Sequence, residues 1–366
     1  MTEKNTILEV RDLRVNFHTY RGEVKALNGV NLKLYEREVL SLVGESGCGK
    51  SVTALTILGL LPENAYIIGG EIGFKRDDLL KKSKDEMRDL RVGEIATVFQ
   101  DPMTFLNPVL TIKDQLEEVF MLDENALKKA VVTQRAQGKP ITYSEFLSQK
   151  TKQGNDANVN SDLRISGNDI KKMAKHLCVE VLGVVKLSDA ERILKDYPFE
   201  LSGGMRQRCM IAMALGRRPS IFVADEITTA LDVTVQAQIL HLLRELRDTI
   251  DASTIMITHD LAVAAEIADR IAVMYAGEVA EVSSTREVFR SPLHPYTQLL
   301  MKAIPNVKKP TASLKTIPGT VPDMIDPPSG CRFHPRCPFA MDICVKASPP
   351  LEEIQKDHHV ACYLYF

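Results

Sequence analysis

Short hydrophobic runs, each ending at a turn and followed by a helical pattern, recur in two parts of the chain. Residues 1–120 show this alternation, and residues 200–290 show it again. Apolar runs without polar alternation are typical of strands buried on both faces, and strands that alternate with helices form mostly parallel sheets. The pattern therefore predicts an α/β fold.

Two stretches depart from this pattern. Residues from about 122 to 170 are polar, with few apolar positions and no heptad pattern, and we expect a mobile surface insertion there. After Ser291, eight prolines between Pro292 and Pro328 exclude long helices, except for a short amphipathic one around residues 296–303. We therefore expect a separate C-terminal module over residues 291–366.

The overall charge gives little reason to expect a protein that binds nucleic acid or an anionic membrane surface. The 366 residues include 46 Lys and Arg against 48 Asp and Glu, and 45% of them are hydrophobic. Such a composition is typical of a folded, soluble chain. No stretch reaches the roughly 18 apolar residues that span a bilayer, and the start lacks the apolar core of a secretory signal. We expect the chain to stay in the cytoplasm.

One hydrophobic run leads into a glycine-rich loop. Residues 39–43, VLSLV, are followed by GESGCGKS at residues 44–51 and then by a helical pattern. In such a strand, loop and helix, backbone N–H groups and the helix N-terminus face a nucleotide phosphate. Lys50 would reach the β- and γ-phosphate oxygens, and Ser51 would bind Mg²⁺. The alternative is a chance glycine-rich turn, which the complete eight-residue pattern in this setting disfavours.

Three other hydrophobic runs end at polar residues suited to phosphate, Mg²⁺ or water. Residues 220–224 precede Asp225 and Glu226, residues 254–258 precede His259, and residues 95–99 precede Gln100. Taken alone, each of these residues is more typical of a solvated or structural strand end. Parallel sheets, however, bind ligands at the carboxyl ends of their strands, so we expect one active site to collect all four ends.

The side chains at these ends have complementary chemistry. Asp225 can hold Mg²⁺ through a water, and Glu226 can act as the hydrolytic base on the attacking water. Gln100 can complete the Mg²⁺ shell and sense the γ-phosphate, while His259 can bind that phosphate and hold Glu226 and the water in line. The predicted catalytic residues are therefore Glu226, His259 and Gln100, and the predicted Mg²⁺ ligands are Ser51, Gln100 and Asp225.

A second anion site is predicted at residues 201–205, LSGGM. Ser202 is a suitable N-cap for the helix that follows, and Gly216 and Pro219 are suitable stop signals. One γ-phosphate cannot easily take two such sites from one chain, so we expect this one to serve a nucleotide held by a second subunit. The alternative is an ordinary capped helix.

Together these motifs resemble the complete set of an ABC-type ATPase over roughly residues 7–290. The set comprises residues 44–51, Gln100, residues 201–205, 221–226 and 230–232, and His259. The resemblance implies an ATP-hydrolysing, RecA-like P-loop NTPase core (residues 1–290) with an antiparallel β subdomain and a helical subdomain at about residues 103–215. It also implies two ATP molecules held between head-to-tail subunits.

An aromatic residue stacks on adenine in that family, and Tyr20 is the best match here, with Phe17 in reserve. The implied nucleotide-binding residues are Tyr20, Gly44, Glu45, Ser46, Gly47, Cys48, Gly49, Lys50, Ser51, Val52, Ser202, Gly203, Gly204 and Asp232. One position departs from the family pattern, because Ile227 stands where a proline usually follows the catalytic acid. We expect this change to loosen the turn beside Glu226 and to alter the hydrolysis rate.

The C-terminal sequence narrows the resemblance. SPLHPYTQLL at residues 291–300, PGTVPD at 318–323 and GCRFHPRCPFAMDIC at 330–344 are similar to the C-terminal region of ATPase subunits of oligopeptide and dipeptide importers. Met205 matches one of the two paired subunits there. The resemblance implies peptide import by a heterodimer with a sibling ATPase, two integral membrane permeases and an extracytoplasmic peptide-binding protein, with this chain peripheral on the cytoplasmic face of the membrane.

Other functions compete with peptide import. Nickel importers and other small-solute importers are close relatives of the peptide importers. A soluble ABC ATPase of DNA repair or translation normally brings a long coiled coil or a second nucleotide-binding domain, neither of which is visible here. A non-hydrolysing regulatory partner would be expected to lack the base, whereas Glu226 is present.

Four of the seven cysteines crowd the end of the chain. Cys331, Cys337, Cys344 and Cys362 are separated by five, six and seventeen residues. Structural zinc usually uses closer cysteine pairs, and the spacing is not that of a ferredoxin. The resemblance to the importer subunits implies a [4Fe-4S] cluster with a structural role at these cysteines. Zinc (Zn²⁺) and free thiols are the alternatives.

Overall fold

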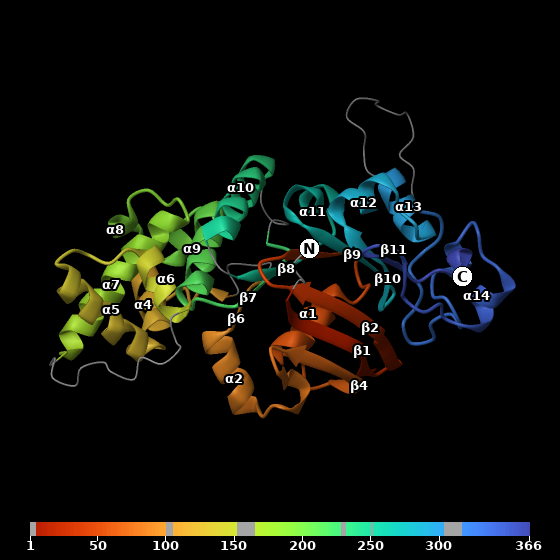
Figure 1. Cartoon of the computed structure of the whole chain (residues 1–366), viewed down its shortest axis with the longest axis horizontal. Coiled ribbons are helices and arrows are strands. Elements are labelled where there is room, and N and C mark those ends of the chain that lie inside the picture. Colours follow the sequence, from red (N-terminus) through yellow and green to blue (C-terminus); the bar gives the residue numbers. More distant parts are fainter. Residues whose placement is uncertain (1–4, 100–104, 152–164, 228–231, 250–251, 304–316) are drawn as a thin grey trace. The chain divides into compact units, whose positions relative to one another are not determined.

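The computed structural model describes residues 5–99, 105–151, 165–227, 232–249, 252–303 and 317–366 (Figure 1). The chain forms two compact units. The first consists of Met1–Met87 with Ser253–Phe366, and the second is Arg88–Ala252. Three residues of the predicted motifs, Gln100, Ala230 and Leu231, lie outside the described residues.

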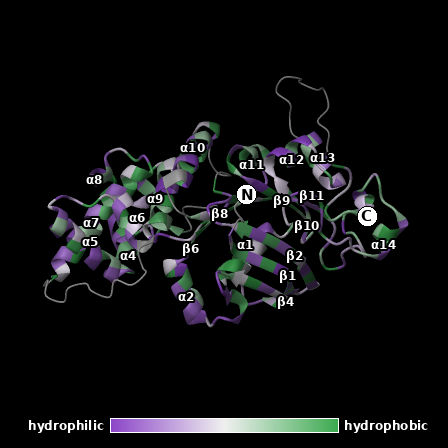
Figure 2. Cartoon of the chain, viewed as in Figure 1, coloured by the Kyte–Doolittle hydropathy of each residue, from purple (hydrophilic) through white to green (hydrophobic). Residues whose placement is uncertain are grey.

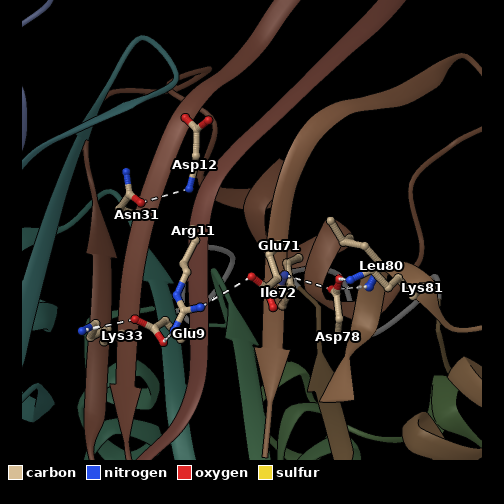
Figure 3. A network of polar contacts seen from close by, with 10 residues as sticks. All are labelled: Glu9, Arg11, Asp12, Asn31, Lys33, Glu71, Ile72, Asp78, Leu80 and Lys81. Carbon is tan, nitrogen blue, oxygen red and sulfur yellow. Dashed lines mark hydrogen bonds and ion pairs between the residues drawn. The ribbon is translucent and has the colours of Figure 1, made fainter. Parts of the chain in front are cut away.

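The first unit contains a four-stranded antiparallel sheet, which confirms the predicted β subdomain. Its strands have the order β2-β1-β4-β5. Polar pairs join three of these strands on one face, with Lys33 Nζ 3.2 Å from Glu9 Oε1 and Arg11 Nη1 3.5 Å from Glu71 Oε2 (Figure 3). Exposed pairs of this kind contribute little stability, so the buried face of the sheet holds it in place. The strands are β1 (Thr6–Thr19), β2 (Gly22–Tyr35), β4 (Ala65–Phe74) and β5 (Asp77–Asp78).

A second sheet of the first unit carries the glycine-rich loop. Its central strand β3 (Val39–Val43) pairs in parallel with β8 (Ser253–Thr258) on one side and with β9 (Arg270–Tyr275) on the other. All five β3 residues are buried, as expected of a strand covered on both faces. Beyond β9, antiparallel strands continue the sheet: β10 (Glu278–Ser284), β12 (His358–Val360) and β11 (Glu352–Gln355).

Helices and short turns complete the first unit. The predicted helix around residues 296–303 is present as α13 (Pro295–Ala303). Two aromatic residues after β10, Tyr296 and Phe333, are almost fully buried in a cluster with Val43 and Tyr275, so the C-terminal region is part of this unit's core. The remaining elements are α1 (Lys50–Leu58), η1 (Leu79–Lys81), α11 (Leu261–Ile267), α12 (Thr285–Arg290), η3 (His334–Arg336), α14 (Asp342–Lys346) and η4 (Tyr363–Tyr365).

The second unit is mainly helical, in agreement with the predicted helical subdomain. Two parallel strands, β6 (Ile95–Val98) and β7 (Ile221–Asp225), pair with each other. Its longest helix, α7 (Gly167–Val184), begins at a capping box between Ser166 and Asp169 and buries one apolar stripe. The other helices are α4 (Ile112–Met121), α5 (Glu124–Gln137), α6 (Tyr143–Thr151), α8 (Ala190–Ile193), η2 (Pro198–Glu200), α9 (Gly203–Gly216) and α10 (Val233–Thr249), while α2 (Lys84–Gly93) bridges the boundary between the units in sequence.

The segment expected to be a surface insertion is largely packed helix, which corrects that expectation. Helix α5 starts at the N-cap Asp123 and buries Leu127 and Val131 among its apolar positions. Tyr143 of α6 is 1% exposed and its hydroxyl donates to the carbonyl of Leu215 at 2.6 Å. A few well-spaced apolar residues therefore anchor a segment whose average composition is polar. Residues 152–164 lie outside the described part.

Hydropathy follows this arrangement. Figure 2 shows bands of hydrophobic and hydrophilic residues alternating along β1, β2 and β4, as expected of strands with one buried face. Within the described residues, no helix has the length and apolar character needed to cross a bilayer.

Candidate nucleotide-binding site

The glycine-rich loop has the strand, loop and helix context that the sequence predicts. Strand β3 ends at Val43, and α1 begins at Lys50 with Gly49 as its N-cap in a left-handed conformation. At Gly44 the loop passes so close to β9 that a Cβ would lie 2.1 Å from the backbone oxygen of Met274. Only glycine fits such an approach, so the packing of the sheet explains why the loop starts with this residue.

The ammonium group of Lys50 lies inside the loop. Its Nζ donates to the carbonyl oxygens of Gly44 at 2.8 Å and Glu45 at 3.0 Å, and lies 3.6 Å from Cys48 Sγ. Burial raises the pKa of the Cys48 thiol, and the neighbouring Lys50 partly opposes this shift. Negatively charged phosphate oxygens can replace these neutral carbonyl and thiol partners of the Lys50 ammonium. Ser51 and Val52 follow in the first turn of α1.

His259 lies at the next strand end of the same unit. Strand β8 runs parallel to β3, with Thr258 opposite Val43, so His259 and the loop emerge at the same edge of the sheet. The His259 side chain is exposed, and Asp260 caps α11 by accepting from the backbone N–H of Ala262 at 2.8 Å. The structure therefore brings His259 and the phosphate loop together.

The two acidic residues end β7 in the second unit. Asp225 is 9% exposed, while Glu226 is half-buried and adopts a left-handed conformation with φ of 49°. Such a conformation costs a non-glycine residue about 1–3 kcal/mol. Ile227 is 4% exposed, so the residue that replaces the family's usual proline is buried. Strand β6, which leads toward Gln100, is the parallel neighbour of β7.

The predicted second anion site is a capped helix start in the same unit. The Ser202 hydroxyl accepts from the backbone N–H of Met205 at 3.4 Å, and the helix ends at Gly216, as expected. A Cβ at Gly204 would lie 2.7 Å from Val235 Cγ1 of α10, so this glycine lets two helices approach. Asp232 caps α10 by accepting from the backbone N–H of Val235 at 2.9 Å.

The predicted adenine-stacking residue stands out from the surface. Tyr20 lies in the turn between β1 and β2 and is 98% exposed. The reserve candidate, Phe17, is a half-buried residue of β1. Because the Tyr20 ring is exposed within the first unit, a planar ligand can stack on it.

Comparisons with known proteins identify the family. The model of the ABC transporter family matches residues 27–229, and that of the oligopeptide/dipeptide transporter C-terminal region matches residues 280–344. The chain belongs to the ABC transporter family. This result confirms the resemblance inferred from the motifs, including the C-terminal sequence.

Several ABC transporter proteins resemble the chain over nearly its whole length. The dipeptide transport ATP-binding protein DppD of Bacillus subtilis is 42% identical over 359 residues, which cover 98% of this chain and 94% of that protein. The oligopeptide transport ATP-binding protein OppD of Escherichia coli is 42% identical over 361 residues, covering 99% and 94%.

Solved structures confirm the ABC ATPase fold. The dimeric ATP-binding cassette MJ0796 bound to ADP and Pi matches with a TM-score of 0.56 and 26% identity, covering 76% of this chain and 99% of that one. The structure of cbiO1 from Clostridium perfringens matches with a TM-score of 0.55 and 22% identity, covering 79% and 92%.

The motifs did not reveal one contact of the ABC phosphate loop. Arg336 of the C-terminal region forms an ion pair with Glu45, with Nη1 2.8 Å from Oε2. These residues are 291 positions apart, and no sequence spacing connects them. The sequence indicates only that the two residues carry opposite charges and that Arg336 lies between Cys331 and Cys337.

The four C-terminal cysteines lie in one region, but they do not fit a preformed metal site. Cys344 and Cys362 are buried, Cys331 and Cys337 are half-buried, and all four are free of disulfides. Burial raises the pKa of Cys331 to about 12 and also raises those of Cys337 and Cys362. Across the described ranges, no three His, Cys, Asp or Glu side chains are grouped to hold a metal ion.

Proposed function

We propose that the chain is the ATP-binding and ATP-hydrolysing subunit of an ABC importer of dipeptides or oligopeptides. The observation that carries this proposal is the similarity to peptide-transport ATP-binding proteins over 98% of the chain, which includes the peptide-transporter C-terminal region. The charged lysine inside the loop after β3 gives the chemical basis for phosphate binding. Nickel import and soluble ABC functions are the alternatives, and the matched C-terminal region favours peptides over both.

In the proposed site, Lys50 binds the β- and γ-phosphate oxygens of ATP. Ser51, Gln100 and Asp225 would hold a Mg²⁺ ion, which would supply positive charge to the phosphates when bound. Glu226 accepts a proton from the attacking water, and His259 holds the γ-phosphate in line with that water. The proximity of His259 to the loop supports its role, and the parallel pairing of β6 with β7 supports a shared role for the strand ends that precede Gln100 and Asp225.

A second subunit completes the site in this proposal. The Ser202, Gly203 and Gly204 backbone at the start of α9 would bind the γ-phosphate of a nucleotide held by the partner, and Asp232 would lie near it. MJ0796, a dimer with ADP and Pi bound, supports this arrangement by its similarity of fold. We propose a heterodimer with a sibling ATPase, since the motif LSGGM with Met205 is similar to that of one of the two paired importer subunits.

The remaining partners follow from the peptide-import proposal. Two integral membrane permeases would form the pathway, an extracytoplasmic protein would deliver the peptide, and this chain would act from the cytoplasmic face of the membrane. Closure of the ATPase dimer would drive the permeases through the segment after Gln100.

An iron–sulfur cluster at the four cysteines is the finer part of the proposal. The crowding of Cys331, Cys337, Cys344 and Cys362 at the end of the chain supports it, whereas no three potential ligands among the described residues are grouped to hold a metal ion. Iron and sulfide analysis of anaerobically purified protein decides the question. A brown sample with about four irons per chain supports the cluster, and a colourless sample without iron refutes it.

Transport by the reconstituted complex tests the function. Proteoliposomes are made with this chain, its sibling subunit, the permeases and the binding protein, so that the ATPase subunits face the lumen. They should take up labelled peptide only when the lumen contains ATP. The Glu226→Gln complex, which keeps the nucleotide site but lacks the base, is the matched control and should not transport. Uptake of nickel without uptake of peptide would establish the alternative cargo.

A further inference from the structure

The C-terminal region reaches the phosphate loop through one buried arginine. Arg336, in the short helix η3, has a side chain that is 5% exposed. Its guanidinium contacts both carboxylate oxygens of Glu45, with Nη1 2.8 Å from Oε2 and Nη2 3.2 Å from Oε1. A planar fork that meets a carboxylate in this way is the strongest and most directional of the ion pairs between side chains.

Glu45 connects this arginine to the working part of the loop. Its backbone N–H donates to Tyr296 Oη at 3.0 Å, and its carbonyl oxygen accepts from Lys50 Nζ at 3.0 Å. The residue is therefore fixed at its side chain, its N–H and its carbonyl. A displacement of the Glu45 side chain would move the carbonyl that positions the Lys50 ammonium.

Arg336 itself is held by rigid neighbours. Its Nε donates to the carbonyl of Pro318 at 2.8 Å, and its Nη1 also lies 3.3 Å from the Tyr275 hydroxyl. Tyr275 packs against Tyr296 and Phe333, with ring centroids 4.7 and 5.0 Å apart. Burial disfavours the charge of Arg336, but its guanidinium donates hydrogen bonds to Glu45 and Tyr275 that compensate for burial, and arginine stays protonated at any ordinary pH.

Charge explains why such a contact matters for a triphosphate. Glu45 is the second residue of a loop that we propose surrounds the phosphates of ATP, and its side chain is only 28% exposed. An unpaired carboxylate there would repel the nucleotide and could turn toward the Lys50 ammonium. The fork of Arg336 neutralises the carboxylate and keeps it turned away from the phosphate-binding groups.

We propose that Arg336 is a positioning residue of the nucleotide site, through which the C-terminal region holds the phosphate loop in its ATP-binding form. It acts on Glu45 and does not itself touch the nucleotide. The proposal deepens the proposed ATPase function and depends on it. It assigns to the C-terminal region a role in ATP binding in addition to any role in metal binding or in contacts with other subunits.

A rescue experiment on the full chain tests the proposal. Its readout is the dissociation constant of a fluorescent ATP analogue. Arg336→Ala should weaken binding by about 5- to 30-fold, because it leaves a charged, half-buried carboxylate beside the phosphates. Glu45→Gln in the Arg336→Ala background should restore affinity to within about threefold of the wild type, since the repelling charge is gone. Arg336→Lys keeps the charge but lacks the planar guanidinium, so its dissociation constant should lie between those of Arg336→Ala and the wild type.

The opposite end of β3 offers a matched control. Arg270 and Glu38 form a buried ion pair there, with Nη1 3.2 Å from Oε1 and both side chains under 10% exposed. Arg270→Gln should lower the melting temperature without changing ATP affinity. If Arg336→Ala does not fold, the ATP affinities of Arg336→Lys and of the double variant are compared with that of the wild type instead.

Two results would overturn the inference. The first is unchanged ATP affinity in the folded Arg336 variants, and the second is a double variant that binds ATP no better than Arg336→Ala, which indicates a merely structural arginine. A failure of the proposed function looks different, because the wild type would then bind no ATP and would match Lys50→Ala. The wild type must bind and Lys50→Ala must not for the Arg336 comparison to be made.

Discussion

Replacing Gly44 with alanine should destabilise the first unit far more than the same change at Gly47 in the same loop. Both residues have positive φ, +152° and +79°, so alanine is strained at either position. At Gly44, however, the new Cβ would lie 2.1 Å from the backbone oxygen of Met274, whereas at Gly47 it meets nothing within 4 Å. The backbone conformation costs about 1–2 kcal/mol at both positions, and crowding adds about 2 kcal/mol or more at Gly44.

Thermal melting followed by circular dichroism measures this difference, and it suits a chain without tryptophan. A unit of this size loses roughly 2–4 °C of melting temperature per kcal/mol. Gly44→Ala should therefore lower the melting temperature by about 10 °C and Gly47→Ala by about 4 °C. Equal shifts would contradict the reasoning, because they would show that close approach to β9 is not what requires glycine at residue 44.

Other predictions concern catalysis, adenine binding, pH and the thiols. Glu226→Gln should reduce ATP turnover at least about 100-fold while ATP still binds; retained turnover would refute the base. Tyr20→Ala should raise KM for ATP by about 2- to 10-fold without changing the melting temperature, since the ring is 98% exposed, and Tyr20→Phe should behave as the wild type. Burial lowers the pKa of His294 to about 4, despite the nearby Glu281, so the unfolded chain binds a proton that the folded chain does not. Stability should consequently fall by up to about 3 kcal/mol as pH drops from 6.5 to 4, and His294→Asn, followed by melting at several pH values, should flatten that dependence. Cys331 should react slowly with iodoacetamide at pH 8, because burial raises its pKa to about 12, and fast labelling of the folded protein would contradict that assignment.

The phosphate loop could be predicted from sequence because its cause is local. An uninterrupted apolar run, a series of glycines and a helical pattern follow one another within 20 residues, and each is a property of adjacent positions. The apolar run predicts a strand at residues 39–43, and the structure has β3 at Val39–Val43, with α1 starting at Lys50. Ser202 as N-cap and Gly216 as the end of α9 were predicted for the same reason.

The helices α5 and α6 were missed because composition averages over both faces of a helix. Leu127, Val131 and Phe146 are enough to anchor them, although the surrounding residues are polar. The local signals were present, since Asp123 caps α5 and Gly138 ends it in a left-handed conformation. These capping residues mark the start and the end of α5 even where the average composition is polar.

The contact between Glu45 and Arg336 could not be predicted from spacing. It joins residues 291 positions apart, and it exists only because Phe333 and Tyr296 bring the C-terminal region into the core beside β9. Long-range ion pairs of this kind depend on tertiary packing, which a motif does not encode. The same holds for the four C-terminal cysteines, because their spacing does not show that two of them are buried and two half-buried, or that no three ligands are grouped among the described residues.

The most direct test of the proposed site is an experimental structure of the Glu226→Gln protein with its sibling subunit and Mg²⁺-ATP. We expect Lys50, Ser51, Asp225 and His259 to surround a single triphosphate, with a helix start equivalent to Ser202–Gly204 of the sibling subunit closing it. Nucleotide bound elsewhere, or Asp225 and His259 directed away from the triphosphate, would contradict the proposed mechanism.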